Sequence, residues 1–160
     1  MAEERVIGVI PQALRKTGRI RSDAFTLVVT DRRVIAAKET DAVRKAHAAQ
    51  QRAAGHGPRL FGLLGRGGGT PLAGRYLAMD PEAALAETPG NQAFAPGSVR
   101  EVAISRGNRL GDEGVLEHYL FIRFADGQGN ADFTTTTESP RLPAAVALLR
   151  PLFGPALREG

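Results

Sequence analysis

The sequence predicts one domain of the α+β class, with an antiparallel sheet and helices to one side or end of it. Segments rich in β-branched and apolar residues lie near both ends of the chain, and a stretch with helical spacing separates them. No internal repeat is evident, and 160 residues fit one domain better than two. The expected domain therefore spans residues 1–160.

The composition excludes several other classes of protein. Hydrophobic residues make up 42% and charged residues 24%, as in ordinary globular proteins, so a collagen repeat and disorder throughout are excluded. The chain has no cysteine, which excludes a disulfide scaffold. The longest apolar runs, such as residues 142–149, are too short to span a bilayer. No secretory signal is visible after Met1, so we expect a cytoplasmic protein, with peripheral attachment to a membrane as an option.

The first half of the predicted sheet begins with a strand over residues 4–10, which Pro11 is expected to end. Residues 24–38 predict a hairpin, because two β-branched runs flank Thr30-Asp31-Arg32-Arg33. Threonine and aspartate bond to their own backbone in tight turns. One face of this hairpin is expected to bury Phe25, Leu27 and Val29, with Val34 or Ile35 across from them.

The middle of the chain predicts two helices. Residues 41–54 have helical spacing, with Thr40 or Asp41 as the N-cap. A second short helix is expected from Asp80 and Pro81 to about Glu87. The apolar stripe of the first helix is almost all alanine, so we expect it to dock lightly; its members are Ala42, Val43, Ala46, Ala49 and Ala53.

Strand patterns return after residue 92. Strands are expected over 99–104, 118–125 and 131–137, with a loop at 106–114 and a turn at 126–129. The chain is expected to end in a helix with Ser139 as N-cap and Pro140 in its first turn, broken near Arg150 because proline follows. Its apolar stripe is expected to contain Leu142, Ala145, Val146 and Leu149, with Leu152 or Phe153 as a further member.

The run from Leu27 to Ile35 resembles a hairpin common in bacterial PH-like (pleckstrin-homology-like) and GRAM-like domains. In those domains a strand ends in Thr-Asp or Thr-Asn, and one or two basic residues precede the next strand. The resemblance implies a PH-like, strongly bent antiparallel sheet closed by a C-terminal amphipathic helix, here residues 142–153. Residues 40–92 would then form a helical, glycine-rich insertion. The family implies binding to lipid headgroups, to peptides or to further copies of the domain, and the fold alone does not choose among these.

The charge of the chain is unevenly distributed. Residues 1–75 contain 14 Lys and Arg against 6 Asp and Glu, a net +8, whereas residues 76–160 contain 7 against 11, a net −4. A basic half can face an anionic partner. Arginine is far commoner than lysine here and alanine and glycine are abundant, which is also typical of proteins encoded by GC-rich DNA, so both interpretations remain open.

Two groups of residues are candidates for binding. Arginine can hold phosphate groups through paired hydrogen bonds, and the resemblance implies that hairpin tips gather at one open end of the sheet. The predicted ligand-binding residues are Arg15, Lys16, Arg19, Arg21, Arg32 and Arg33. An apolar run between Arg59 and Arg66 is predicted either to touch a membrane or partner or to pack inside the domain; it comprises Leu60, Phe61, Leu63 and Leu64.

The sequence predicts neither catalysis nor a cofactor. The glycines at 62–69 lack the lysine of a phosphate-binding loop. His47, His56 and His118 have no partners at metal-ligand spacing, and His47 is expected on the solvent side of its helix. There is no cysteine nucleophile and no G-x-S-x-G elbow. Nucleic-acid binding is not expected, because no aromatic platform or helix-turn-helix is recognisable.

These observations predict a non-catalytic binding module. The leading hypothesis is protein–protein interaction or self-association through sheet edges and the insertion. The alternative is peripheral binding to anionic membrane lipids through the basic hairpin surface. A small enzyme of unrecognised type would need a deep polar pocket with a buried carboxylate or histidine.

Overall fold

The computed structural model describes residues 3–53, 71–110, 113–114, 116–135 and 140–160. Strands, then helices, then strands and a helix follow one another as the sequence predicts, with additional short elements. In chain order these are β1 (Val6–Lys16), β2 (Ser22–Thr30), β3 (Val34–Lys38), α1 (Asp41–Ala53), α3 (Pro71–Gly74), the 3₁₀ helix η1 (Arg75–Leu77), α4 (Pro81–Ala86), β4 (Gln92–Phe94), β5 (Glu101–Leu110), β6 (Leu116–Ala125), β7 (Asn130–Thr134), α5 (Leu142–Phe153), the 3₁₀ helix η2 (Gly154–Ala156) and β8 (Leu157–Glu159).

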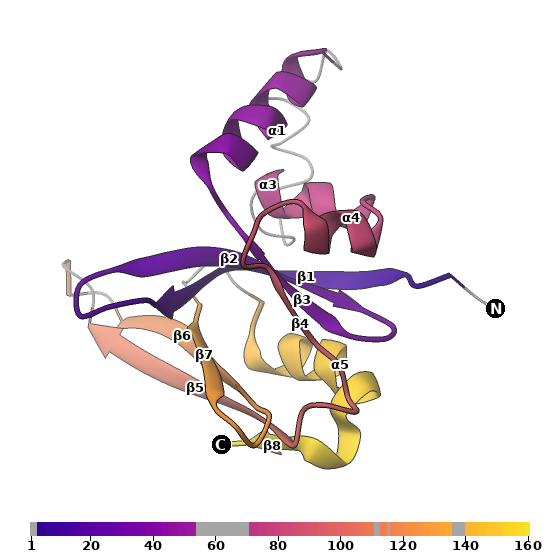
Figure 1. Cartoon of the computed structure of the whole chain (residues 1–160). Coiled ribbons are helices and arrows are strands. Elements are labelled where there is room, and N and C mark those ends of the chain that lie inside the picture. Colours follow the sequence, from indigo (N-terminus) through magenta and orange to yellow (C-terminus); the bar gives the residue numbers. More distant parts are fainter. Residues whose placement is uncertain (1–2, 54–70, 111–112, 115, 136–139) are drawn as a thin grey trace.

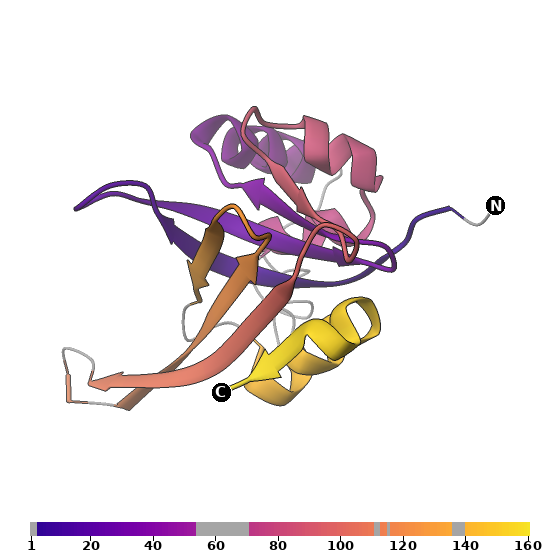
Figure 2. The ribbon, with the colours of Figure 1, turned by 60° about the horizontal axis from the view of Figure 1, so that its bottom comes forward.

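The strands form one sheet in the order β4-β3-β2-β1-β7-β6-β5-β8. Neighbouring strands are antiparallel except β5 and β8, which are parallel. Within the described ladder, β1 and β7 are joined by a single residue pair, Leu14 with Thr134. The sheet bends at this corner, so that its two halves enclose the core between them (Figures 1 and 2). The expected α+β class with a bent sheet is confirmed.

The hairpin predicted over residues 24–38 is confirmed as β2 and β3. Phe25, Leu27 and Val29 lie in the main core, and of the two expected partners in β3 it is Val34, together with Ala36, that joins them. The opposite face is buried as well, because Val28 and Ile35 pack beneath the helices of the middle segment. Burial on both faces explains why these runs are apolar almost without interruption.

Two predicted strand boundaries are wrong. Pro11 does not end β1, because the register shifts between Ile10 and Ala13 and a bulge accommodates Pro11 together with Gln12, whose φ is 52°. The predicted loop at 106–114 is a hairpin instead, since β5 continues to Leu110 and β6 starts at Leu116. There Tyr119 lies across Gly107, where a Cβ would sit 2.5 Å from the ring.

Aromatic rings from four elements join the two halves of the sheet. Phe94 of β4 stacks on Phe124 of β6 at a centroid distance of 4.4 Å. Phe124 also meets Phe133 of β7 edge-on at 6.1 Å and Phe153 of α5 at 6.0 Å. All four rings belong to one apolar cluster, and Phe124 is the ring that touches each of the others.

Helix α5 lies against β1 and β5 (Figure 1). Its buried residues are Ala145, Val146, Leu149 and Phe153, with Leu142 and Leu152 packed at the edge of the core, as the stripe predicts. The predicted break near Arg150 is wrong: α5 runs to Phe153 with Pro151 inside it. Its N-cap is Arg141 with a proline in the first turn, so Pro140 lies outside the helix, and Ser139 lies outside the described residues.

The helices between β3 and β4 lie on the side of β1–β3 away from α5 (Figure 1). Both predicted caps are confirmed: Thr40 Oγ1 accepts the Val43 backbone N–H, and Asp80 accepts that of Ala83. The alanine stripe expected on α1 is wrong, because Val43 and His47 are the buried residues and Ala42, Ala46 and Ala49 are exposed. Larger side chains bury more area and therefore decide which face docks.

Candidate functional site

The six basic residues predicted to bind a ligand do not lie together. Four of them lie at the end of β1 or in the turn between β1 and β2, whereas Arg32 and Arg33 lie in the β2–β3 turn. Strand β2 has nine residues, and at about 3.3 Å per residue it separates these two places by roughly 25–30 Å. The two hairpin ends point in opposite directions (Figure 1). The expectation that these hairpin tips gather at one end is therefore wrong.

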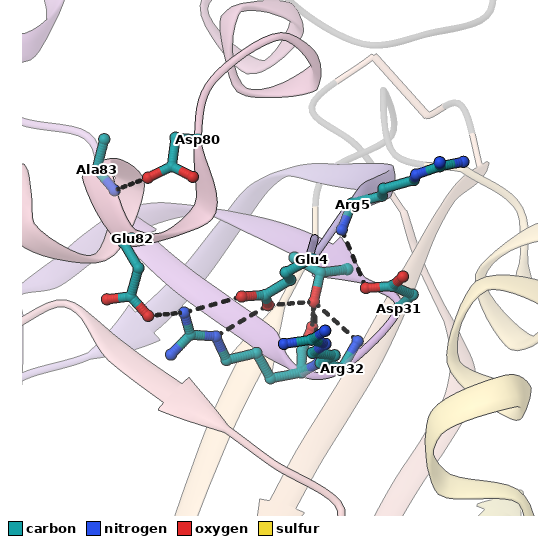
Figure 3. Close-up of polar contacts among 9 residues, drawn as sticks. Glu4, Arg5, Asp31, Arg32, Asp80, Glu82 and Ala83 are labelled. Carbon is teal, nitrogen blue, oxygen red and sulfur yellow. Dashed lines mark hydrogen bonds and ion pairs between the residues drawn. The ribbon is translucent and has the colours of Figure 1, made fainter. Parts of the chain in front are cut away.

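The β2–β3 turn is organised by Thr30. Its Oγ1 accepts the backbone N–H groups of Arg32, at 3.1 Å, and of Arg33, at 2.9 Å (Figure 3). The same hydroxyl donates to Glu4 Oε2 at 2.6 Å. Asp31 Oδ1 accepts the N–H of Arg5 at 3.0 Å, and the Asp31 N–H donates back to the Arg5 carbonyl at 2.9 Å. Hydrogen bonds from Thr30 and Asp31 thus hold Glu4 and Arg5 against the β2–β3 turn.

Arg33 completes that attachment. Its Nε and Nη2 donate to the two carboxylate oxygens of Glu4, each at 3.0 Å, and Nη2 also contacts Glu82 of α4 at 2.5 Å (Figure 3). The side chain is mostly buried, and the hydrogen bond to Glu4 is the main cause that raises the pKa of Arg33. Arg33 is committed to these two carboxylates, so we assign it a structural role.

The β1–β2 tip presents its side chains to solvent. The Thr17 N–H donates to the Arg21 carbonyl at 3.0 Å and closes the turn. Lys16, Arg19 and Arg21 are exposed, and Ile20 between the two arginines is 97% exposed. We call Lys16, Arg19, Ile20 and Arg21 the basic tip. Ile20 was not among the predicted binding residues, although an apolar residue between arginines in a short turn is a visible signal.

Arg15 is placed differently from the basic tip. Its Nη1 donates to Gln92 Oε1 of β4 at 2.6 Å, and its guanidinium lies 6.0 Å from the centroid of the Phe133 ring. Cation–π contact and hydrogen bonding hold the side chain along the end of the core rather than in the turn. Arg15 therefore takes part in packing as well as in the positive charge of this end of the molecule.

An open groove of about 630 Å³ lies beside the basic tip, between the end of β1 and the outward face of β5, β6 and β7. Phe121 is 46% exposed there and Leu14 is 37% exposed. Arg123 donates from Nε and Nη2 to the carboxylate of Asp132 at 2.7 and 3.1 Å, and this pairing raises the pKa of Arg123. The groove thus combines exposed apolar side chains with one internally paired cation.

A buried polar cluster lies under the helices, on the other side of the sheet. The Tyr76 hydroxyl donates to Glu87 Oε1 at 2.8 Å, and Arg75 contacts both oxygens of Glu87 at 2.9 and 2.7 Å. Tyr76 is fully buried, and burial, aided by the contact with Glu87, raises its pKa. This cluster joins η1 to the end of α4. Arg75 and Tyr76 belong to η1, and Glu87 follows α4. No pattern in the sequence indicated that these residues would meet.

His47 faces this cluster rather than solvent. His47 is 8% exposed, so the prediction that it lies on the solvent side of the helix is wrong. Burial and the positive charge of Arg75 lower the pKa of the His47 imidazole. In the unfolded chain histidine takes up a proton near pH 6.5, whereas the folded state resists it, so stability is expected to fall as the pH drops below about 6.5.

The substitution His47→Leu is expected to reduce this acid sensitivity. The variant has no imidazole to charge, so its urea midpoint should decline less than that of the wild type between about pH 7 and pH 5. Urea unfolding followed by circular dichroism at several pH values measures this difference. Equal declines in the two proteins would contradict the assignment of His47 to a buried neutral position.

The second predicted contact group, Leu60, Phe61, Leu63 and Leu64, lies outside the described residues, as does His56. Within the described ranges, no three His, Asp or Glu side chains are grouped as a metal site requires. None of the described helices has the length and apolar character needed to cross a bilayer.

Comparisons with protein-family models, with curated proteins and with solved structures found no match to this chain.

Proposed function

We propose that this protein is a non-catalytic binding module with a PH-like fold that attaches to anionic membrane surfaces through its basic tip. The observation that carries the proposal is Ile20, which is 97% exposed and flanked by Arg19 and Arg21. An isoleucine in water at a turn contributes nothing to the core of the domain. At a membrane interface it would bury apolar surface while the neighbouring cations meet lipid phosphates.

The magnitudes are sufficient for reversible attachment. Each lysine or arginine near an anionic surface contributes about 1 kcal/mol, and the basic tip has three. Burial of an isoleucine side chain contributes roughly 1.5–3 kcal/mol more. The β1–β2 hairpin extends to one end of the domain, where the β5–β6 hairpin also ends, so the basic tip can approach a flat surface (Figures 1 and 2). The bent sheet and α5 support the PH-like part of the proposal.

Charge reversal at the basic tip is the direct test. Wild-type protein is expected to sediment with phosphatidylserine-containing vesicles and not with phosphatidylcholine vesicles, and raising the salt should weaken binding. Arg19→Glu or Arg21→Glu replaces an attraction of about 1 kcal/mol by a similar repulsion, so partitioning should fall about 30-fold. Ile20→Ser should also weaken binding.

Arg32→Glu is the matched control. It changes the net charge by the same amount on an exposed residue at the other end of β2, and it should leave vesicle binding nearly unchanged. An equal loss in Arg32→Glu would indicate attraction by net charge alone and would contradict a role for the tip. Absence of binding to phosphatidylserine vesicles would overturn the proposal. A defined oligomer by light scattering in that case would favour self-association instead.

A further inference from the structure

The floor of the groove beside the basic tip is a continuous row of side chains across four strands. Leu14 of β1 pairs with Thr134 of β7, Thr134 with Phe121 of β6, and Phe121 with Ser105 of β5. Paired residues in neighbouring strands project from the same face of a sheet. The row therefore places two large, partly exposed apolar side chains, Leu14 and Phe121, on either side of a small threonine.

The next row carries the polar part of the floor. Asp132 of β7 pairs with Arg123 of β6, which pairs with Ala103 of β5. The charges of Arg123 and Asp132 cancel within their ion pair. Arg15 and Lys16 of β1 also line the groove, so its lining has three cations and one anion, a net charge of +2 (3 − 1). Arg19 and Arg21 extend the positive charge beyond the groove. An acidic occupant matches this charge.

The geometry favours an extended chain over a compact ligand. The volume is within the range of ligand sites, but the groove is open along the face of the sheet. Asn130, Asp132 and Thr134 of β7 line it, and in the described ladder β7 meets β1 only at Thr134. The side of β7 that faces β1 thus offers backbone groups with which an added strand can pair.

The aromatic rings on this face of the sheet disfavour a nucleic acid. The Tyr119 and Phe121 rings meet edge-on, at 86° and 5.0 Å, so they form no flat platform on which bases could stack. We infer that this groove binds an extended, acidic segment of a partner protein through the Leu14–Thr134–Phe121 row, with one large apolar side chain of the segment seated between Leu14 and Phe121. This surface adjoins the membrane contact proposed above and shares Lys16 with it, whereas Ile20 belongs to the basic tip and does not line the groove.

The test uses the whole protein, labelled with ¹⁵N, and short blocked peptides with acidic residues on both sides of a central phenylalanine. Amide resonances of Leu14, Phe121 and Thr134 are expected to shift on titration, whereas that of Asp31 in the distant turn should not. A peptide with serine at the centre should bind at least fivefold more weakly, since the apolar anchor is lost. A peptide with lysine in place of the acidic residues should not bind.

Two substitutions check the assignment by fluorescence polarisation. Phe121→Ala is expected to weaken peptide binding about tenfold, and Leu77→Ala, at a 54% exposed residue of η1, should have no effect. Ile20→Ser should weaken vesicle binding and leave peptide binding unchanged, so the two proposals can fail separately. The inference is overturned if no peptide shifts the groove amides, if the shifts lie elsewhere, or if a single-stranded RNA shifts them and the acidic peptides do not.

Discussion

Replacing Phe124 with alanine is expected to lower the free energy of unfolding by about 4 kcal/mol. Phe124 is 2% exposed and contacts Phe94, Phe133 and Phe153, which belong to β4, β7 and α5. The truncation removes the transfer free energy of a phenyl ring and leaves a cavity where elements far apart in sequence converge. For a domain of this size the midpoint of thermal unfolding should fall by roughly 10 °C.

Phe121→Ala is the matched control for this experiment. It removes the same ring from the same strand, three residues earlier and on the opposite face, where Phe121 is 46% exposed. Phe121→Ala should lower the free energy of unfolding by less than about 1 kcal/mol, because much of the ring already contacts water. Calorimetry of both variants measures the difference. Similar losses would mean that the two faces of β6 are not assigned as the structure has them.

Replacing Glu87 with alanine is expected to cost about 3 kcal/mol, a value at the lower end of the range for a broken buried ion pair. The change leaves the mostly buried guanidinium of Arg75 and the hydroxyl of Tyr76 without the carboxylate that they share. Because η1 and α4 are short, they have little stability apart from this cluster and the apolar contacts beneath it. Urea unfolding measures the loss.

Two further variants separate charge from packing at Glu87. Glu87→Gln keeps an acceptor for Tyr76 but removes the charge that pairs with Arg75, so its cost should lie between those of wild type and Glu87→Ala. Asp132→Ala breaks an exposed pair with Arg123 that has similar distances, and its cost should be at most about 1 kcal/mol. If the losses at Glu87 and Asp132 were equal, burial of the cluster would not be what makes it matter.

Local patterns accounted for much of the fold. The hairpin at Thr30, the cap at Asp80 and the buried face of α5 depend on hydrogen bonds and periodicities within a few residues, and all three are confirmed. The errors at Pro11 and Pro151 share a cause. Proline was expected to end an element, but a bulge absorbs it in β1, and α5 continues through it.

The candidate site was predictable only in part. The sequence singled out the arginines near the hairpin. Leu14 and Phe121 were missed because their exposure depends on which strands meet, which a local pattern does not show, whereas Ile20 could have been noticed from its place between two arginines in a short turn. His47 shows the same limit: the spacing of α1 predicted an exposed position, whereas in the folded chain the residue is buried and close enough to Arg75 to feel its charge.

The α+β class, the β2–β3 hairpin and the run of basic residues from Arg15 to Arg21 could be predicted from the sequence, since these follow from neighbouring residues along the chain. Which cations are exposed depends on contacts between residues far apart in the chain. Arg33 is occupied because Glu4 and Glu82, 29 and 49 residues away, reach it, whereas Arg19 and Arg21 project at the other end of β2. Likewise, the row from Leu14 to Phe121 exists only because β1 meets β7. Pairing between distant strands depends on register and on the bend of the sheet, which local periodicity does not specify.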